Sequence, residues 1–242
     1  MTLKAGMKFL TLIFLQILQL PLSSLKANFW TKKNPNLYFG SIDKNQIQRL
    51  EGGFIGLSLK PSHFSEIRCD ISKGSLPFAS NSIDKVQAED VFEHIQLDSL
   101  PKVCDEIFRV LKKGGVFRLS VPDYNSIVLK KRSIYDYEGR VIADPLTGSS
   151  VYYDFRSEKT LIRHGTDGNS HLWFPTKDLL DSLIQNSDLR LCDSIKFWHY
   201  NLSEGDFILE GFPELCMPVF RCPPKDMRAD GLPISIIVDF LK

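Results

Sequence analysis

Residues that could do chemistry follow two apolar segments between Asp70 and His94. Asp70 lies near the end of "IRCDI", just before glycine and proline residues that favour a turn, and Asp90, Glu93 and His94 follow "DKVQAE". In open α/β sheets, ligands bind at the carboxyl ends of strands. Carboxylates there can bind hydroxyl or amine groups, and a histidine can transfer protons near neutral pH. The pattern therefore predicts a binding site at one edge of a sheet.

Alternating strands and helices must position these residues. The sequence predicts strands over residues 37–41, 54–59, 67–71, 84–89 and 116–121, and a helix from Leu100 to Leu111 whose apolar residues recur at helical spacing. Asp98 or Ser99 would cap this helix and Gly114 would end it in the left-handed conformation. Strand, helix and strand in this order predict a parallel sheet with right-handed crossovers.

The second half of the chain begins with a segment of different character. Residues 124–170 are polar and rich in tyrosine, with no dominant period, and we expect an insertion or lid there. A helix capped by Thr176 should follow, then a strand in "LCDSIKFW" and a closing strand in "ISIIVDFLK".

The composition is that of an ordinary globular protein. Of the 242 residues, 43% are hydrophobic and 24% charged, and the formal net charge is +1, so we expect no nucleic-acid partner. The five cysteines form no zinc-binding spacing, and we expect reduced thiols and no metal site. "LKKGG" ends the expected helix instead of starting one, which argues against a phosphate-binding loop.

Residues 1–35 are expected to form a separate N-terminal unit of an apolar helix and a linker. Lys4 and Lys8 precede an apolar run over residues 9–22, too short for a comfortable membrane span. One interpretation is a helix docked on the protein or making peripheral contact with the inner membrane surface. The other is a secretory signal, although the nearby cleavage contexts are poor. We expect a cytoplasmic protein, with membrane association left open.

The segment from Asp70 to Gly115 resembles the core of class I S-adenosylmethionine-dependent methyltransferases, in particular the type 11 group. The motifs that carry the resemblance are Asp70, "LPF" at 76–78, "DKV" at 84–86, Glu93-His94 and "RVLKKGG" at 109–115. Five motifs in the family's order are a specific signal. The segments "HLWFPTKDLLDSLIQ" and "DGLPISIIVDFLK" resemble the end of a group associated with sugar and cell-surface polymer synthesis.

The resemblance covers residues 36–242 and implies an α/β fold. It is Rossmann-like and doubly wound, with a mostly parallel seven-stranded sheet and helices on both faces. It also implies an enzyme that uses S-adenosyl-L-methionine and methylates a small-molecule or saccharide acceptor. The implied cofactor-binding residues are Gly40, Ser41, Ser58, Asp70, Ile71 and Asp90, with Asp70 facing the adenine amine. His94 and His171 are the candidate catalytic residues.

Two positions depart from the family pattern. The glycine turn reads "FGSIDKNQ", with one glycine where the family has two, and Ser58 stands where the family has an acid that binds the ribose hydroxyls. Losing that charged acceptor would cost about 1.5–3 kcal/mol, or one to two decades in affinity. Asp43 is near enough to compensate. Cofactor binding is therefore weakened, rebuilt or lost.

Structural interpretations stand beside the functional ones. Asp70 and Glu93 can cap turns, Asp84 can simply begin a strand, and His94 can be a buried histidine satisfied by its neighbours. Asp123, after the expected fifth strand, points to the same cleft or caps a loop. The alternative for the whole chain is an inactive methyltransferase-fold scaffold. The hypothesis of an exported binding protein rests only on the apolar run near the N-terminus.

Overall fold

The structure is a computed structural model. It describes residues 35–42, 52–165, 168–202, 205–211 and 234–242, together with Phe29 and Val219. The expected N-terminal helix over residues 9–22 lies outside these described residues. Among the residues that are described, no helix is long and apolar enough to cross a membrane.

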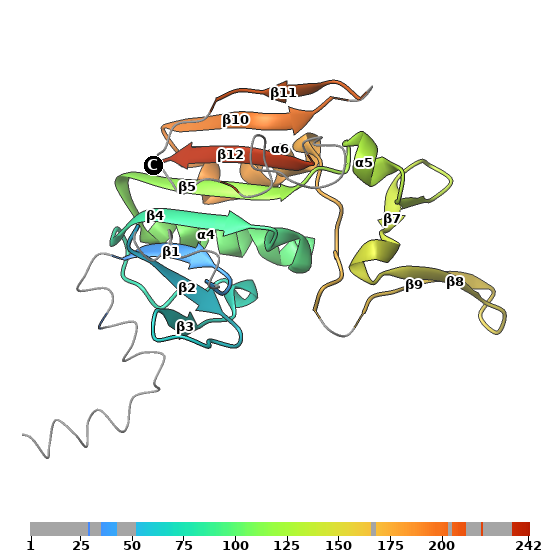
Figure 1. The fold of residues 1–242 in the computed structure, drawn as a ribbon, viewed down its shortest axis with the longest axis horizontal. Coiled ribbons are helices and arrows are strands. Elements are labelled where there is room, and N and C mark those ends of the chain that lie inside the picture. The colour runs from blue at the N-terminus through green and yellow to red at the C-terminus, as the bar shows by residue number, and fades with distance from the viewer. Residues whose placement is uncertain are drawn as a thin grey trace, which may run out of the picture.

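An eight-stranded sheet forms the centre of the molecule, in the order β11-β10-β12-β5-β4-β1-β2-β3 (Figure 1). Strands β3, β2, β1, β4 and β5 are parallel, β12 is antiparallel to β5, and β10 and β11 continue the sheet antiparallel. The bounds are β1 Asn36–Phe39, β2 Phe54–Ser58, β3 Glu66–Arg68, β4 Ile83–Glu89, β5 Leu111–Pro122, β10 Ser194–Asn201, β11 Phe207–Leu209 and β12 Ser235–Leu241. The predicted α/β architecture with a mostly parallel, Rossmann-like sheet is confirmed.

The sheet has one strand more than the seven that were expected. The additional strand is β11, which pairs antiparallel with the outer side of β10. It has three residues, and the side chains of Phe207 and Leu209 are exposed. Short edge strands with little burial carry almost no periodic signal, which is why the sequence did not indicate this one.

Two helices cover one face of the sheet. They are α4 (Leu100–Val110) and α6 (Lys177–Gln185), and Figure 1 shows them on the same side. Their apolar residues and the strand residues that face them form the main hydrophobic core. As expected, the Thr176 hydroxyl caps α6 by accepting a hydrogen bond from the Leu179 amide. The expected helices on the opposite face are not among the described elements.

The opposite face of the sheet holds buried polar residues. Because side chains alternate along a strand, Arg118 and Ser120 point away from the core to which Phe117 and Leu119 belong. Arg118 is fully buried and donates to both carboxylate oxygens of Asp239 on β12, at 2.7 and 2.6 Å. The Trp198 indole of β10 donates to the same carboxylate. This ion pair joins the central strands.

The connection between α4 and β5 differs from the expectation. The helix ends at Val110 and Leu111 is already extended, so Gly114 does not end the helix. It has a φ of +77° and lies within β5, where the pairing with β4 shifts register. Neither Asp98 nor Ser99 caps the helix with its side chain, because the short 3-10 turn Leu97–Ser99 leads into it.

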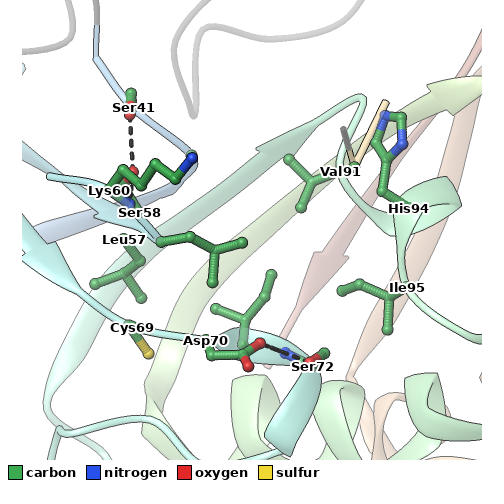
Figure 2. Close-up of a pocket in the computed structure, with 14 residues that line it drawn as sticks. Ser41, Leu57, Ser58, Lys60, Cys69, Asp70, Ser72, Val91, His94 and Ile95 are labelled. Carbon is green, nitrogen blue, oxygen red and sulfur yellow. Dashed lines mark hydrogen bonds between the residues drawn. The ribbon is translucent and has the colours of Figure 1, made fainter. Parts of the chain in front are cut away.

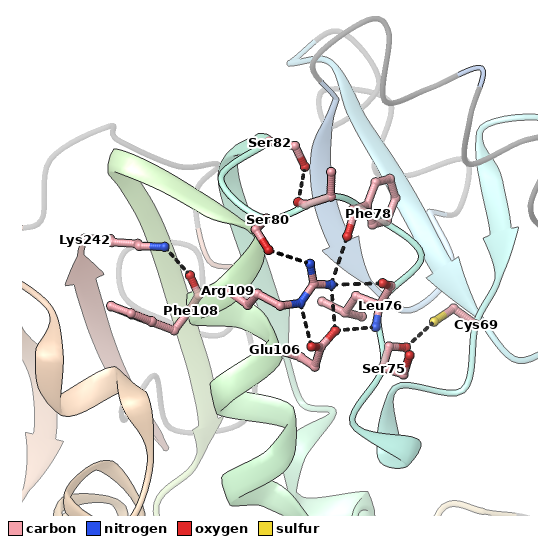
Figure 3. Close-up of polar contacts among 11 residues, drawn as sticks. Cys69, Ser75, Leu76, Phe78, Ser80, Ser82, Glu106, Phe108, Arg109 and Lys242 are labelled. Carbon is pink, nitrogen blue, oxygen red and sulfur yellow. Dashed lines mark hydrogen bonds and ion pairs between the residues drawn. The ribbon is translucent and has the colours of Figure 1, made fainter.

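The arginine of "RVLKKGG" ties α4 to the loop between β3 and β4 (Figure 3). The Arg109 guanidinium donates to the carbonyls of Leu76 and Phe78, at 3.2 and 2.9 Å, and to the carboxylate of Glu106. Glu106 in turn accepts the Leu76 amide at 2.8 Å. The "LPF" and "RVL" motifs thus belong to one structural clamp that holds the loop following Asp70.

We expect the Arg109→Ala variant to lose about 1.5–3 kcal/mol of stability, because charge-assisted hydrogen bonds to two carbonyls disappear. Arg109 is partly exposed, which places the loss at the lower end of that range. Urea denaturation of the two proteins measures it. Arg109→Lys keeps the charge but not the planar fork, so it should recover only part of the loss.

Residues 124–170, where an insertion or lid is expected, lie outside the main sheet. They contain α5 (Ile127–Lys130), the strand pair β6 (Ile134–Tyr135) and β7 (Val141–Ala143), and the hairpin of β8 (Ser150–Asp154) and β9 (Lys159–Arg163). Figure 1 shows the hairpin extending away from the sheet.

Strand β12 has a central place although it comes late in the chain. It pairs along its whole length with β5 on one side, and its residues 237–241 pair with β10 on the other. The Lys242 ammonium then donates to the carbonyls of Phe108 and Leu111 at 2.6 and 2.8 Å, and so joins β12 to the end of α4.

His199 on β10 gives the fold a pH dependence. It is fully buried, its Nδ1 pairs with the Ser235 carbonyl, and burial lowers the pKa of its imidazole below the ordinary value of 6.5. The folded protein therefore keeps the ring neutral where the unfolded chain binds a proton. The contribution of His199 to the free energy of unfolding is constant above pH 6.5 and falls as the pH decreases from 6.5 toward the lower folded pKa.

We expect urea denaturation to give a lower free energy of unfolding at a pH of about 5.5 than at about 7.5. In the His199→Gln variant, which can still donate to Ser235, the difference between the two pH values should shrink. An unchanged difference would assign the pH dependence to other groups.

Candidate active site

A cavity of about 480 Å³ opens at the carboxyl ends of β1, β2 and β3 (Figure 2). Its walls come from the ends of β1 and β2, the turn after β3 and the segment after β4. The lining residues are Gly40, Ser41, Leu57, Ser58, Leu59, Lys60, Cys69, Asp70, Ile71, Ser72, Val91, His94, Ile95 and Gly168. Figure 2 shows Ser58 and His94 on opposite sides of the cavity. The volume is typical of sites for small molecules and cofactors.

The turn after β1 brings backbone close to the cavity. Gly40 has a φ of +113°, a conformation that residues with a Cβ atom rarely adopt. A Cβ atom on Gly56 of β2 would lie 2.8 Å from the Gly40 carbonyl oxygen, so β2 also requires glycine here. The single glycine of "FGS" therefore sits at a real turn, and two neighbouring residues of that turn line the cavity.

Ser58 is the last residue of β2 and lies where the resemblance places the ribose-binding residue. Its hydroxyl pairs with the Ser41 hydroxyl at 2.9 Å and accepts the Lys60 amide at 3.1 Å. The pair offers hydroxyl groups to a ligand but no negative charge. Asp43, the residue that could compensate, lies outside the described residues.

Asp70 and Ile71 form the floor of the cavity. The Asp70 carboxylate accepts the Ser72 amide and hydroxyl, at 3.2 and 2.6 Å, and so caps the 3-10 turn Ile71–Lys73. Both capping contacts use the same carboxylate oxygen, Oδ1. Asp70 can therefore cap the turn and still line the cavity. Asp90, by contrast, has a φ of +51° and does not line this cavity.

Cys69 lines the cavity without the properties of a nucleophile. Burial and the neighbouring Asp70 raise the pKa of its thiol to about 11, so it is protonated at neutral pH. The thiolate is the reactive form. The protonated Cys69 thiol is therefore a poor nucleophile.

His94 stands beside a second histidine and a buried carboxylate. Glu93 is fully buried, and its Oε1 lies 3.8 Å from Nε2 of His94 and 3.8 Å from Nε2 of His171. The two imidazole rings meet edge to face, with centroids 5.0 Å apart. The backbone joins the two segments as well, because the Leu172 amide donates to the Glu93 carbonyl. The two predicted catalytic histidines are therefore neighbours.

A chain of polar groups continues from His171 into the insertion. The Tyr124 hydroxyl lies 2.6 Å from His171 Nδ1 and donates to Asp144 at 2.7 Å. Arg132 forms an ion pair with the same Asp144 carboxylate. Burial is the main cause that raises the pKa of Tyr124 above its ordinary value, and the hydrogen bond to Asp144 raises it further. The phenol therefore keeps its proton.

Several members of this chain could not be found from the sequence. Tyr124, Arg132 and Asp144 lie in a segment without periodicity, and nothing in their spacing indicates that they meet His171. Ser170, whose carbonyl lies 3.1 Å from His94 Nδ1, acts through its backbone and leaves no signal at all.

Asp123 and Asp84 have structural roles. Asp123 is fully buried, and its carboxylate accepts the backbone amides of Asn125 and Asn201. Burial raises the pKa of Asp123. Asp84 is the second residue of β4 and forms an exposed ion pair with Lys112. For both residues the structural interpretation holds.

Residues 42–119 match the family model described as a methyltransferase domain. This segment includes the strands and turns that form most of the cavity. Residues 42–119 therefore belong to a methyltransferase domain. The match ends before the insertion and therefore does not cover His171 or its polar neighbours.

Some solved structures are similar to this chain at low sequence identity. They include a putative S-adenosylmethionine-dependent methyltransferase from Listeria monocytogenes, with 13% identity, 91% of this chain and 98% of that chain covered, and a TM-score of 0.43. A second, from Mesorhizobium loti, has 13% identity, coverage of 86% and 90%, and a TM-score of 0.43. A third is the Burkholderia thailandensis 1,6-didemethyltoxoflavin-N1-methyltransferase, with 13% identity, coverage of 91% and 76%, and a TM-score of 0.42. No curated protein matches the chain significantly. Similarity at this level says nothing about the acceptor.

The residues of the methyltransferase domain fit S-adenosylmethionine. The cavity is large enough, its floor carries the Asp70 carboxylate, and the turn at Gly40 lets backbone approach a ligand. Ser41 and Ser58 would bind the ribose hydroxyls, and Asp70 would face the adenine amine with the backbone of Ile71 beside it. The missing charge at Ser58 predicts weaker binding than an acid would give.

Proposed function

We propose that the domain transfers a methyl group from S-adenosylmethionine to a small polar acceptor, a saccharide or a related compound, that lies beside His94 and His171. The observation that supports this most is the cavity itself, because it joins the expected cofactor residues on one side to His94 on the other. The resemblance of the chain's end to a sugar-associated group favours a saccharide.

Bound S-adenosylmethionine would supply a methyl group that is already activated by a positively charged sulfur. The bond between sulfur and the methyl carbon would break as the acceptor atom bonds to that carbon. The chain has to align the acceptor and help it lose a proton. Asp70, Ser41 and Ser58 hold the nucleoside end in place. His94 and His171 then provide the polar groups beside the acceptor, with the buried Glu93 behind them. Roles for Asp90 in cofactor binding and for residues 124–170 as a lid remain part of this proposal.

Binding of S-adenosylhomocysteine to the full chain tests the cofactor site by calorimetry. We expect saturable binding with one site, and absence of heat at millimolar ligand would contradict the proposal. The Asp70→Asn variant should bind about tenfold more weakly, since a charged acceptor becomes a neutral one. Asp84→Asn removes an equal charge from an exposed pair away from the cavity and should leave affinity unchanged.

The cofactor also supports the expected location. S-adenosylmethionine is made and kept in the cytosol, which favours a cytoplasmic enzyme over an exported binding protein. Peripheral membrane contact through residues 9–22 stays a prediction, and a near-neutral net charge favours a small acceptor over nucleic acid.

A further inference from the structure

We propose that Glu93, His94 and His171 bind one divalent transition-metal ion, with Zn²⁺ as the first candidate. The sequence indicated no metal site, because the usual signals are cysteines and histidines at short spacing. Here two ligands are adjacent and the third comes from beyond the insertion. The metal site itself does not depend on the proposed function. Only the identity of the acceptor that the ion would bind rests on it.

The ligand atoms are close enough to converge on one ion. Oε1 of Glu93 and one ring nitrogen of each histidine all lie within 4.8 Å of one another, and the carboxylate oxygen is 3.8 Å from each Nε2. Bonds of about 2.1 Å to a tetrahedral ion would place such atoms about 3.4 Å apart. Side-chain movements on the order of 1 Å would close the site.

The second nitrogen of each imidazole is held in the way that metal sites require. His94 Nδ1 lies 3.1 Å from the Ser170 carbonyl oxygen, which can only accept, so Nδ1 carries a proton and Nε2 has the lone pair. Tyr124 gives its one proton to Asp144, so its oxygen accepts from His171 Nδ1. Both Nε2 atoms then turn lone pairs toward Glu93. Ligating histidines typically donate their other N–H to a carbonyl or similar acceptor.

The charges also favour a cation. With both imidazoles neutral, the three converging groups carry the negative charge of Glu93, which is fully buried. Two histidines and a carboxylate are a known ligand set for zinc and for iron(II) sites that keep open positions for a further ligand.

The open side of such an ion would face the acceptor. His94 is the most exposed of the three ligands, at 28% of its side chain, and it lines the cavity. A metal-bound hydroxyl has a lowered pKa, so the ion would favour an oxygen acceptor. The hydroxyl proton would pass to solvent, the oxygen would bond to the methyl carbon, and the carbon–sulfur bond would break to give neutral S-adenosylhomocysteine.

Titration of the metal-free full chain with Co²⁺ tests the site without any methyl transfer. Co²⁺ replaces Zn²⁺ and gives visible absorption bands whose intensity reports the coordination number. We expect one equivalent to bind with bands of a four- or five-coordinate ion, and Zn²⁺ to displace it. Glu93→Gln and His171→Gln should each weaken binding by more than about 100-fold. His63→Gln changes an exposed histidine elsewhere and should leave the bands unchanged.

Tyr124→Phe removes the acceptor of His171 Nδ1 while keeping both ligands in place, and it should weaken binding about tenfold. If the buried ligand variants fail to fold in circular dichroism, the partly exposed His94→Gln decides the matter. The proposal would be overturned if adding Co²⁺ to the metal-free chain gave no bands, or if the bands survived the loss of a ligand. Binding of S-adenosylhomocysteine is measured separately, so failure of the metal site leaves the proposed function standing.

Discussion

The Ser58→Asp variant is expected to bind S-adenosylhomocysteine about ten- to a hundredfold more tightly than the unchanged chain. The new carboxylate would lie at the end of β2, beside the Ser41 hydroxyl and the Lys60 amide that now contact Ser58. It would give the ribose hydroxyls a charged acceptor, which is worth about 1.5–3 kcal/mol. Calorimetry on the two proteins measures the difference.

The Ser58→Asn variant separates charge from shape, because asparagine is nearly isosteric with aspartate but neutral. It should gain little affinity. A loss of affinity in Ser58→Asp would have the opposite meaning: the cavity would be built around the Ser41–Ser58 hydroxyl pair, and an acid would disturb it. No binding by any of the three proteins would favour the inactive scaffold.

The Asp239→Asn variant is expected to lose about 3–5 kcal/mol of stability, because it removes the carboxylate charge that pairs with the fully buried Arg118. The loss is large compared with the total stability of about 5–15 kcal/mol that is usual for a domain. Guanidinium or urea denaturation, followed by circular dichroism, measures it.

Two controls show whether burial causes the effect. Asp84→Asn breaks the exposed pair with Lys112 and should cost less than about 1 kcal/mol. In this pair the Lys112 side chain is 30% exposed and the Asp84 side chain is 50% exposed. Replacing both Arg118 and Asp239 by apolar residues should recover most of the stability, since no charge is then left unpaired. A cost in Asp239→Asn as small as that of Asp84→Asn would show that the buried pair is well solvated.

The sequence carried most of the information about the fold. The alternation of apolar segments around "LPF" and "RVL" predicted the parallel strands and α4, since buried strands and amphipathic helices have clear periods. Element boundaries carry a weaker signal. Gly114 was expected to end α4, but the helix stops at Val110 because the chain must extend at once to pair with β4.

The candidate site was predictable only where it lies on regular elements. Ser58, Asp70 and His94 line the cavity because each follows a strand of the sheet, and strand ends meet at one edge. The grouping of His171 with Glu93 depends on the path of the insertion, in which polar residues show no period. Long-range contacts of that kind arise from tertiary packing and leave no local signal.

The place of β12 has a consequence for how the molecule is made. Residues 235–241 fill the gap between β5 and β10, so a growing polypeptide on the ribosome cannot close its central hydrogen-bonded ladder until this segment has emerged. Until then β5 would show an unpaired edge, the kind of surface that promotes aggregation. Nascent chains stalled before residue 235 should therefore depend on chaperones more than complete ones do.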